Sequence, residues 1–202
     1  MAGLTLTTAP AAEPLSRTDA KLHLRVDDSA DDDLIDVLIR VARQRCEDVT
    51  RRSLITTAWK LTLHSFPSTI YLPRPPVQVD ESGYIVSLKY YDTAGDQQTL
   101  DAGEYDVLTT GVLAEIMPAY SYSWPSIRSH ADMVEVNYKS GYGDAATDVE
   151  EQAEPLIQGM KLLIGHLYEN REGVVVGVTA RELPVAVREL WYPYRILGKT
   201  GL

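Results

Sequence analysis

The spacing of hydrophobic residues predicts a long amphipathic helix in the first quarter of the chain. Apolar residues recur at three- and four-residue steps from Leu34 to Val49, which places them on one face of a helix spanning about 31–52. A shorter helix near 17–25 is expected before it, because Ser16 begins a stretch with the spacing of a capping box. The chain therefore opens with two helices.

After Leu54 the period of the pattern changes from helical to strand-like. Hydrophobic and polar residues alternate as far as Leu63, as expected for a strand with one buried face. The proline-rich stretch 73–76 can belong only to a loop or a sheet edge. Further strands are expected at 85–91, 105–109, 112–117 and 133–139. This middle region is therefore predicted to be rich in β-structure.

Helical spacing returns over about 150–170, and a short last helix is expected to begin near Leu183. The predicted fold class is α+β: a small helical bundle with an inserted β-rich region and an extended C-terminal tail. The expected parts are a flexible N-terminal arm at 1–14, a helical core formed by 15–53 and 150–182, the β-rich insertion at 54–149, and a partner-binding tail at 183–202.

Composition excludes several classes of protein. The chain has 202 residues, a formal net charge of −10 and a pI near 4.8, which argues against non-specific DNA binding through phosphates. The acidity is concentrated in residues 53–149, which carry 5 basic and 12 acidic side chains. No apolar run is long enough to span a bilayer, so no membrane partner is expected. A single cysteine, Cys46, and no recognisable secretory signal favour synthesis in a reducing cytoplasm.

No convincing active site is found, and the protein is not expected to be an enzyme. Catalytic serine, phosphate-binding and dinucleotide-binding motifs are absent, and neither cofactor nor metal is predicted. The acidic run around Asp31 lacks the glycine and glutamate of a calcium-binding loop and is better explained by the helix dipole. His166 and Glu169 are one helical turn apart and leave a hydrolase as a remote alternative. Cys46 lies on an apolar helix face and is interpreted as a core residue.

The C-terminal segment is the most informative part of the sequence. Three aromatic residues and one arginine occur within five positions: Trp191, Tyr192, Pro193, Tyr194 and Arg195. Trp, Tyr and Arg are the residue types enriched at interface hot spots. These side chains either bind a partner or close the protein's own core, and the first interpretation is slightly favoured.

Several segments together resemble a known family, the head–tail connector or adaptor (head-completion) proteins of long-tailed phages and phage-like gene transfer agents. The matching segments are 15–26, 42–54 (ARQRCEDVTRRSL), 57–66, 70–76 (IYLPRPP), 90–95, 134–143 (VEVNYKSGYG), 165–172 (GHLYENRE) and 183–197. Each motif is short, and the order and spacing of the set carry the resemblance. The middle region is long and rich in Tyr and Ser, and departs from the family pattern.

The resemblance implies a non-enzymatic homo-oligomeric ring of about twelve copies in the virion neck. It implies that the ring lies between the portal protein and a stopper or tail-completion protein, where it extends the DNA channel without binding DNA specifically. Transferred by position, the portal contacts would be Trp191, Tyr192, Pro193, Tyr194 and Arg195. We expect the long helices to form the contacts within the ring, through Arg40, Arg43, Glu47, Arg51, Glu169 and Arg171.

A second class of function is kept open. The β-rich region could be a ligand-binding module for a sugar or peptide, with Trp59, Tyr120, Tyr122 and Trp124 as an aromatic platform. That hypothesis predicts a monomer with a saturable small ligand, whereas the connector hypothesis predicts a protein partner.

Overall fold

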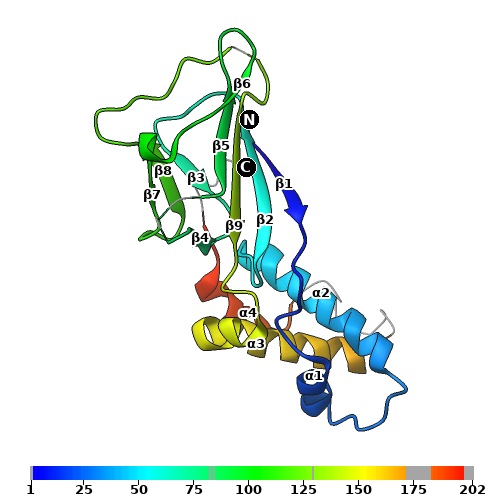
Figure 1. Cartoon of the computed structure of the whole chain (residues 1–202). Coiled ribbons are helices and arrows are strands. Elements are labelled where there is room, and N and C mark those ends of the chain that lie inside the picture. The colour runs from blue at the N-terminus through cyan, green and yellow to red at the C-terminus, as the bar shows by residue number, and fades with distance from the viewer. Residues whose placement is uncertain (1, 82, 84, 129, 172–182, 198–202) are drawn as a thin grey trace. The chain divides into compact units, whose positions relative to one another are not determined.

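The computed structural model describes residues 2–81, 83, 85–128, 130–171 and 183–197 (Figure 1). The chain forms two compact units. The helical unit consists of Ala11–Ile55 and Tyr142–Ile196, and the β-rich unit consists of Met1–Pro10, Thr56–Gly141 and Leu197–Leu202. Helices and antiparallel sheets both occur, so the predicted α+β class is confirmed.

The helical unit contains four α-helices and one 3₁₀ helix among the described residues. They are α1 (Arg17–Leu24), α2 (Asp32–Thr50), α3 (Ala146–Glu169), α4 (Val185–Trp191) and the 3₁₀ helix η2 (Tyr192–Tyr194). The ends of α1 follow local chemistry: the Ser16 hydroxyl accepts a hydrogen bond from the Asp19 amide, and Arg25 takes a left-handed conformation at the C-terminal end. Helix α3 is kinked at Ala153, two residues before Pro155, whose nitrogen has no hydrogen to donate.

A single hydrophobic core holds the helical unit together. Helix α2 packs along α3, and α4 packs against α3 and also contacts α2. The fully buried side chains of this core include Leu15, Ile35, Ala42, Cys46, Leu156, Met160, Ile164 and Trp191. Cys46 is one of them, and burial raises the pKa of its thiol, so it is a core residue rather than a nucleophile.

The β-rich unit contains two antiparallel sheets. The larger sheet has the strand order β1 (Ala2–Thr8), β2 (Thr57–Leu63), β9 (Val134–Ser140), β5 (Ser87–Tyr91) and β6 (Gln97–Thr99), and β4 (Val77–Gln78) also pairs with β9. The smaller sheet has the order β3 (Ile70–Leu72), β8 (Ala114–Pro118) and β7 (Tyr105–Leu108), and the 3₁₀ helix η1 (Ala102–Glu104) precedes β7. Alternate residues of β9, such as Val134, Val136 and Tyr138, are buried, as the period of two predicts.

The N-terminal segment differs from the expected flexible arm. Residues 2–8 form strand β1, which pairs antiparallel with β2 and has a register shift between Leu6 and Thr8. Gly3 is needed for this close pairing, because a Cβ there would come within 2.7 Å of the Thr62 hydroxyl oxygen. The Thr62 hydroxyl in turn donates a hydrogen bond to the Gly3 carbonyl at 3.2 Å. The segment is thus the edge strand of the larger sheet.

Candidate functional site

Trp191 lies in the core of the helical unit, although the sequence analysis expected it among the portal contacts. Its side chain is 0% exposed, and its indole N–H donates a hydrogen bond to the Leu156 carbonyl at 3.1 Å. It lies against Gly159, where a Cβ would come within 2.1 Å of the indole nitrogen. A side chain held in this way is unavailable to another protein unless the unit opens. The aromatic residues of the tail therefore differ in exposure: Trp191 is buried in the core, whereas Tyr192 is exposed.

Tyr192 is the exposed aromatic residue of the tail, and it lies between two arginines. Its ring is 48% exposed, and the guanidinium carbons of Arg188 and Arg195 lie 5.8 and 5.7 Å from the ring centroid. Pro193 is exposed beside it. We call Arg188, Tyr192, Pro193 and Arg195 the C-terminal patch. Arg188 was missed in the sequence analysis, although it lies one helical turn before Tyr192 and so shares its face.

The segment that carries the C-terminal patch is fixed to the end of α2 by one side-chain and one main-chain hydrogen bond. The Arg52 Nε donates to the Tyr194 carbonyl at 2.8 Å, and the Ile196 amide donates to the Thr50 carbonyl at 3.0 Å. Tyr194 itself is half-buried and packs against the helical core. The segment 183–197 is thus folded onto the helical unit, which presents Tyr192 and its arginines on a supported surface.

Arg43 and Glu47, two of the expected ring contacts, form ion pairs within their own chain. Arg43 is almost completely buried and pairs with Glu13 at 2.7 Å and with Glu47 at 2.9 Å. Burial opposes the charged guanidinium, but the hydrogen bond from Arg43 to Glu13 and the charge of Glu47 outweigh it and raise the pKa of Arg43. Glu47 also accepts a hydrogen bond from the Leu54 amide. This cluster ties the start of the helical unit to the end of α2.

Arg171 is also engaged within the helical unit. Its guanidinium binds the Asp31 carboxylate at 2.7 Å and lies 4.5 Å from the ring centroid of Tyr168. The hydrogen bonds from Arg171 and from the Tyr168 hydroxyl hold the pKa of Asp31 below its ordinary value. Asp31 accordingly fastens the start of α2 to the end of α3, a role that dipole arguments did not predict. The remaining expected ring contacts, Arg40, Arg51 and Glu169, are exposed and stay candidates.

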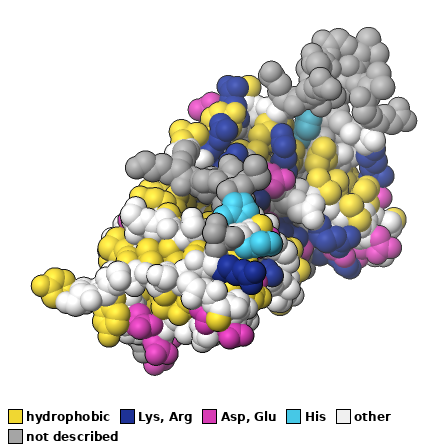
Figure 2. All heavy atoms as spheres, turned by 90° about the horizontal axis from the view of Figure 1, so that it is seen from above, with side chains coloured by type: hydrophobic (Ala, Val, Ile, Leu, Met, Phe, Trp, Pro, Cys, Tyr) yellow, Lys and Arg dark blue, Asp and Glu magenta, His cyan; other side chains and the backbone are white. Residues whose placement is uncertain are grey.

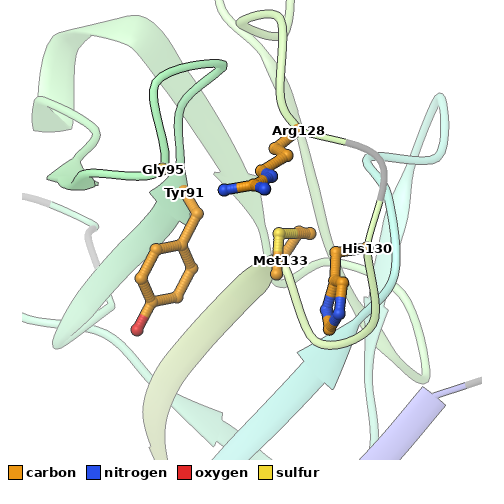
Figure 3. Close-up of a pocket in the computed structure, with 5 residues that line it drawn as sticks. All are labelled: Tyr91, Gly95, Arg128, His130 and Met133. Carbon is orange, nitrogen blue, oxygen red and sulfur yellow. The ribbon is translucent and has the colours of Figure 1, made fainter.

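An open pocket with a volume of about 230 Å³ lies in the β-rich unit (Figure 3). It is lined by Tyr91, Gly95, Arg128, His130 and Met133. Histidine side chains lie next to Lys or Arg side chains on the face shown in Figure 2. The lining offers one guanidinium and one imidazole but no nucleophile paired with a base, so the pocket has no arrangement for catalysis.

The four aromatic residues of the alternative ligand platform have different surroundings. The ring of Trp124 stacks on Phe66 with a centroid separation of 4.7 Å, and its indole N–H donates to the Pro67 carbonyl at 2.7 Å. Trp59 is half-buried beneath the Arg74 guanidinium. Tyr120 and Tyr122 are exposed. One face of each tryptophan is thus already occupied, and the ligand-binding hypothesis gains no support from this arrangement.

Other chemistry considered from the sequence is not assembled in the described part of the chain. His166 and Glu169 are both exposed on α3, and no hydrogen bond between them is found there. The described residues contain no group of three His, Cys, Asp or Glu side chains placed to hold a metal ion. Among the same residues, no helix is both long and apolar enough to cross a membrane.

Comparison with known proteins points to one family. Residues 18–99, from α1 to β6, match the family model described as phage gp6-like head-tail connector protein. This part of the chain is similar to head–tail connector proteins. This match confirms the resemblance inferred from the motifs, and it spans parts of both units. A comparison with curated protein sequences gave no match.

Chains in solved structures of gene transfer agent particles have a similar fold over nearly their full length. One similar chain comes from a structure described as the neck of an empty gene transfer agent (GTA) particle computed with C6 symmetry; the TM-score is 0.77, with 23% identity and 98% of both chains covered. Chains from the virion of a native GTA particle and from the neck of a native GTA particle computed with C12 symmetry give TM-scores of 0.75 and 0.74, with the same identity and coverage. The connector-like signature thus lies within a fold that is shared over nearly the full length.

Proposed function

We propose that this protein is a non-enzymatic head–tail connector of a phage or a gene transfer agent. It forms a homo-oligomeric ring in the virion neck, binds the portal protein on one side and a stopper or tail-completion protein on the other, and extends the channel through which DNA passes. The observation that carries the proposal is the combination of the connector family match over 18–99 with a neck-protein fold covering 98% of the chain.

In this proposal, the C-terminal patch is the contact with the portal. Tyr192 supplies a rigid aromatic surface, and Arg188 and Arg195 supply the cations that flank it. Such a combination is typical of interface hot spots, where an amphipathic ring and a guanidinium are desolvated together. Because the patch is already folded onto α2, little conformational entropy is lost when it binds. Trp191 contributes by supporting the patch from the core.

Charge is compatible with a passage for DNA. Each copy carries a formal net charge of −10, so a ring of copies brings together many carboxylates. Carboxylates that face the channel repel phosphates, and the DNA then moves along the wall without binding specifically. A channel wall with a strongly positive potential in the assembled ring would contradict this part of the proposal.

The direct test is capture of the assembled portal protein of the same particle by the full-length chain. The informative variant is Tyr192→Ala combined with Arg195→Glu, because both side chains lie outside the core. Removing the tail after Glu189 would be a poor test, since it also removes Trp191 from the core. The matched control is Tyr120→Ala, which changes a tyrosine that is 95% exposed in the other unit.

We expect the wild type and the Tyr120→Ala control to capture the portal equally, and the Tyr192/Arg195 double variant to lose at least tenfold in affinity. Equal binding by all three proteins would preserve the connector function and refute the patch. No binding by the folded wild type would count against the connector function itself.

A further inference from the structure

We propose that the exposed side of α2 in one copy docks on the exposed side of α3 in the next copy, and that this contact closes the ring. We call Val37, Arg40, Val41 and Arg45 the α2 face, and Glu151, Glu154 and Gln158 the α3 face. The inference rests on the proposed connector function, because it needs a second copy of the chain as the partner, and it specifies how that copy binds.

The α2 face combines exposed apolar side chains with cations. Val37 and Val41 are 45% and 42% exposed, and they lie one helical turn apart outside the stripe that enters the core. Arg40 and Arg45 flank them, and both are exposed. Arg45 forms no ion pair within the described part of the chain, so its charge is available to a partner. The arginines are a residue type enriched at interfaces, and the two valines give them an apolar surface on which a partner can pack.

The α3 face is acidic, and its carboxylates have no ion-pair partner among the described residues. Glu154 and Gln158 lie one helical turn apart after the kink at Ala153, Glu151 lies just before the kink, and all three are exposed. Neither glutamate forms an ion pair with any described residue. Their position in the first half of α3 suits the helix dipole, but it leaves two carboxylates free to meet arginines of another molecule.

The two faces point away from the same core. Helix α2 buries Ile35, Ala42 and Cys46 in it, and α3 buries Leu156 and Met160, while the two helices lie side by side within the helical unit (Figure 1). Because the α2 and α3 faces are different surfaces, their contact is heterologous. Repeated heterologous contacts close into a ring when the rotation between copies allows it. Charge complementarity selects the second copy as the occupant, since the cationic face and the acidic face are carried by every chain.

Charge reversal tests this pairing. The first variant is R40E with R45E, and the second is E151K with E154K; circular dichroism confirms that each is folded. Each variant alone places like charges opposite each other, and we expect its self-association, followed by sedimentation velocity over a range of concentrations, to weaken at least tenfold. An equimolar mixture is expected to regain association, because each altered face then meets an opposite charge on the other variant.

Cysteine cross-linking provides a second readout that does not require a stable ring. Val41→Cys in one batch of protein and Gln158→Cys in another are joined by a short bismaleimide, and the buried Cys46 stays unreactive. We expect the mixed pair to cross-link faster than a control pair with Tyr120→Cys in place of Gln158→Cys. Two results would mean that another surface joins the copies or that another protein covers these faces. One is that the wild type associates but the mixture of charge-reversed variants does not regain association. The other is that the test pair and the control pair cross-link at the same rate. Either result overturns the inference, as does a wild type that neither associates nor cross-links, while portal capture tests the connector function separately.

Discussion

The indole ring of Trp191 occupies the space above Gly159 of α3, where the distance from a Cβ to the indole nitrogen would be 2.1 Å. The residue that seemed suited to a partner from its sequence context is therefore the residue that fastens α4 to α3. Because of this contact, the stability of the helical unit depends on the absence of a methyl group at Gly159.

We expect Gly159→Ala to destabilise the protein by about 1–3 kcal/mol, because the added methyl group must displace a fully buried indole. Urea denaturation measures the change. Gly165→Ala is the matched control on the same helix: its Cβ would have its nearest neighbour, the His23 ring, at 3.7 Å, which is an ordinary contact. That substitution is expected to stabilise the protein by about 0.5–1 kcal/mol through helix propensity. Equal effects of both substitutions would contradict the packing described for Trp191.

Removal of the Arg43 side chain is expected to leave two carboxylates without their shared cation. Arg43→Met keeps much of the apolar volume but removes the bonds to Glu13 and Glu47, and we expect a loss of about 2 kcal/mol, since both acids are partly exposed. Arg45→Met changes an exposed arginine on the same helix and is expected to stay within about 0.5 kcal/mol of the wild type. Thermal and urea unfolding of the two variants measure these changes in stability. If Arg43→Met unfolds no more easily than Arg45→Met, the cluster does not stabilise the unit.

The Asp31 carboxylate gives the helical unit a defined acid sensitivity. Hydrogen bonds from Arg171 and Tyr168 lower the pKa of Asp31 in the folded state, so its stabilising contribution is complete above the unfolded-state value of about 3.9. The contribution is lost as the pH falls from there through the folded-state pKa. We therefore expect the wild type to be more stable than Asp31→Asn at pH 7, and the difference to shrink in acid.

Denaturation of both proteins at neutral and acidic pH measures this difference. Asp33→Asn is a suitable control, because Asp33 is exposed on the same helix and forms no ion pair within the described residues. A gap between wild type and Asp31→Asn that stays constant down to strongly acidic pH would show that the Arg171–Asp31 bond is not responsible.

The position of a helix or strand could be predicted from the sequence where a regular hydrophobic pattern extended over many residues. Helix α2 was expected at 31–52 and is found at Asp32–Thr50, because a long amphipathic period reports directly which side enters the core. Strand β9 was expected at 133–139 and is found at Val134–Ser140 for the same reason. Strand β1 was missed, since its only partner among the described residues, β2, lies some fifty positions later and nothing in the local sequence indicates the pairing.

The candidate site could be predicted only in part. Composition identifies the tail as aromatic and basic, but it cannot distinguish Trp191, which fills the space over Gly159, from Tyr192, which lies one residue later on the surface. The roles of Arg43 and Arg171 depend on carboxylates that are distant along the chain, Glu13 and Asp31, so only the fold reveals that these arginines are already engaged. Residues 172–182 of the expected helical core and 198–202 of the expected tail lie outside the described residues.

The central claim is that this protein joins head to tail, and loss of the protein tests it most directly. Particles should be produced in cells that encode them with this coding sequence deleted, and examined by electron microscopy. We expect heads and tails to accumulate separately, and the wild-type chain supplied in trans to restore joined particles. Normally tailed particles in the absence of the protein would contradict the account.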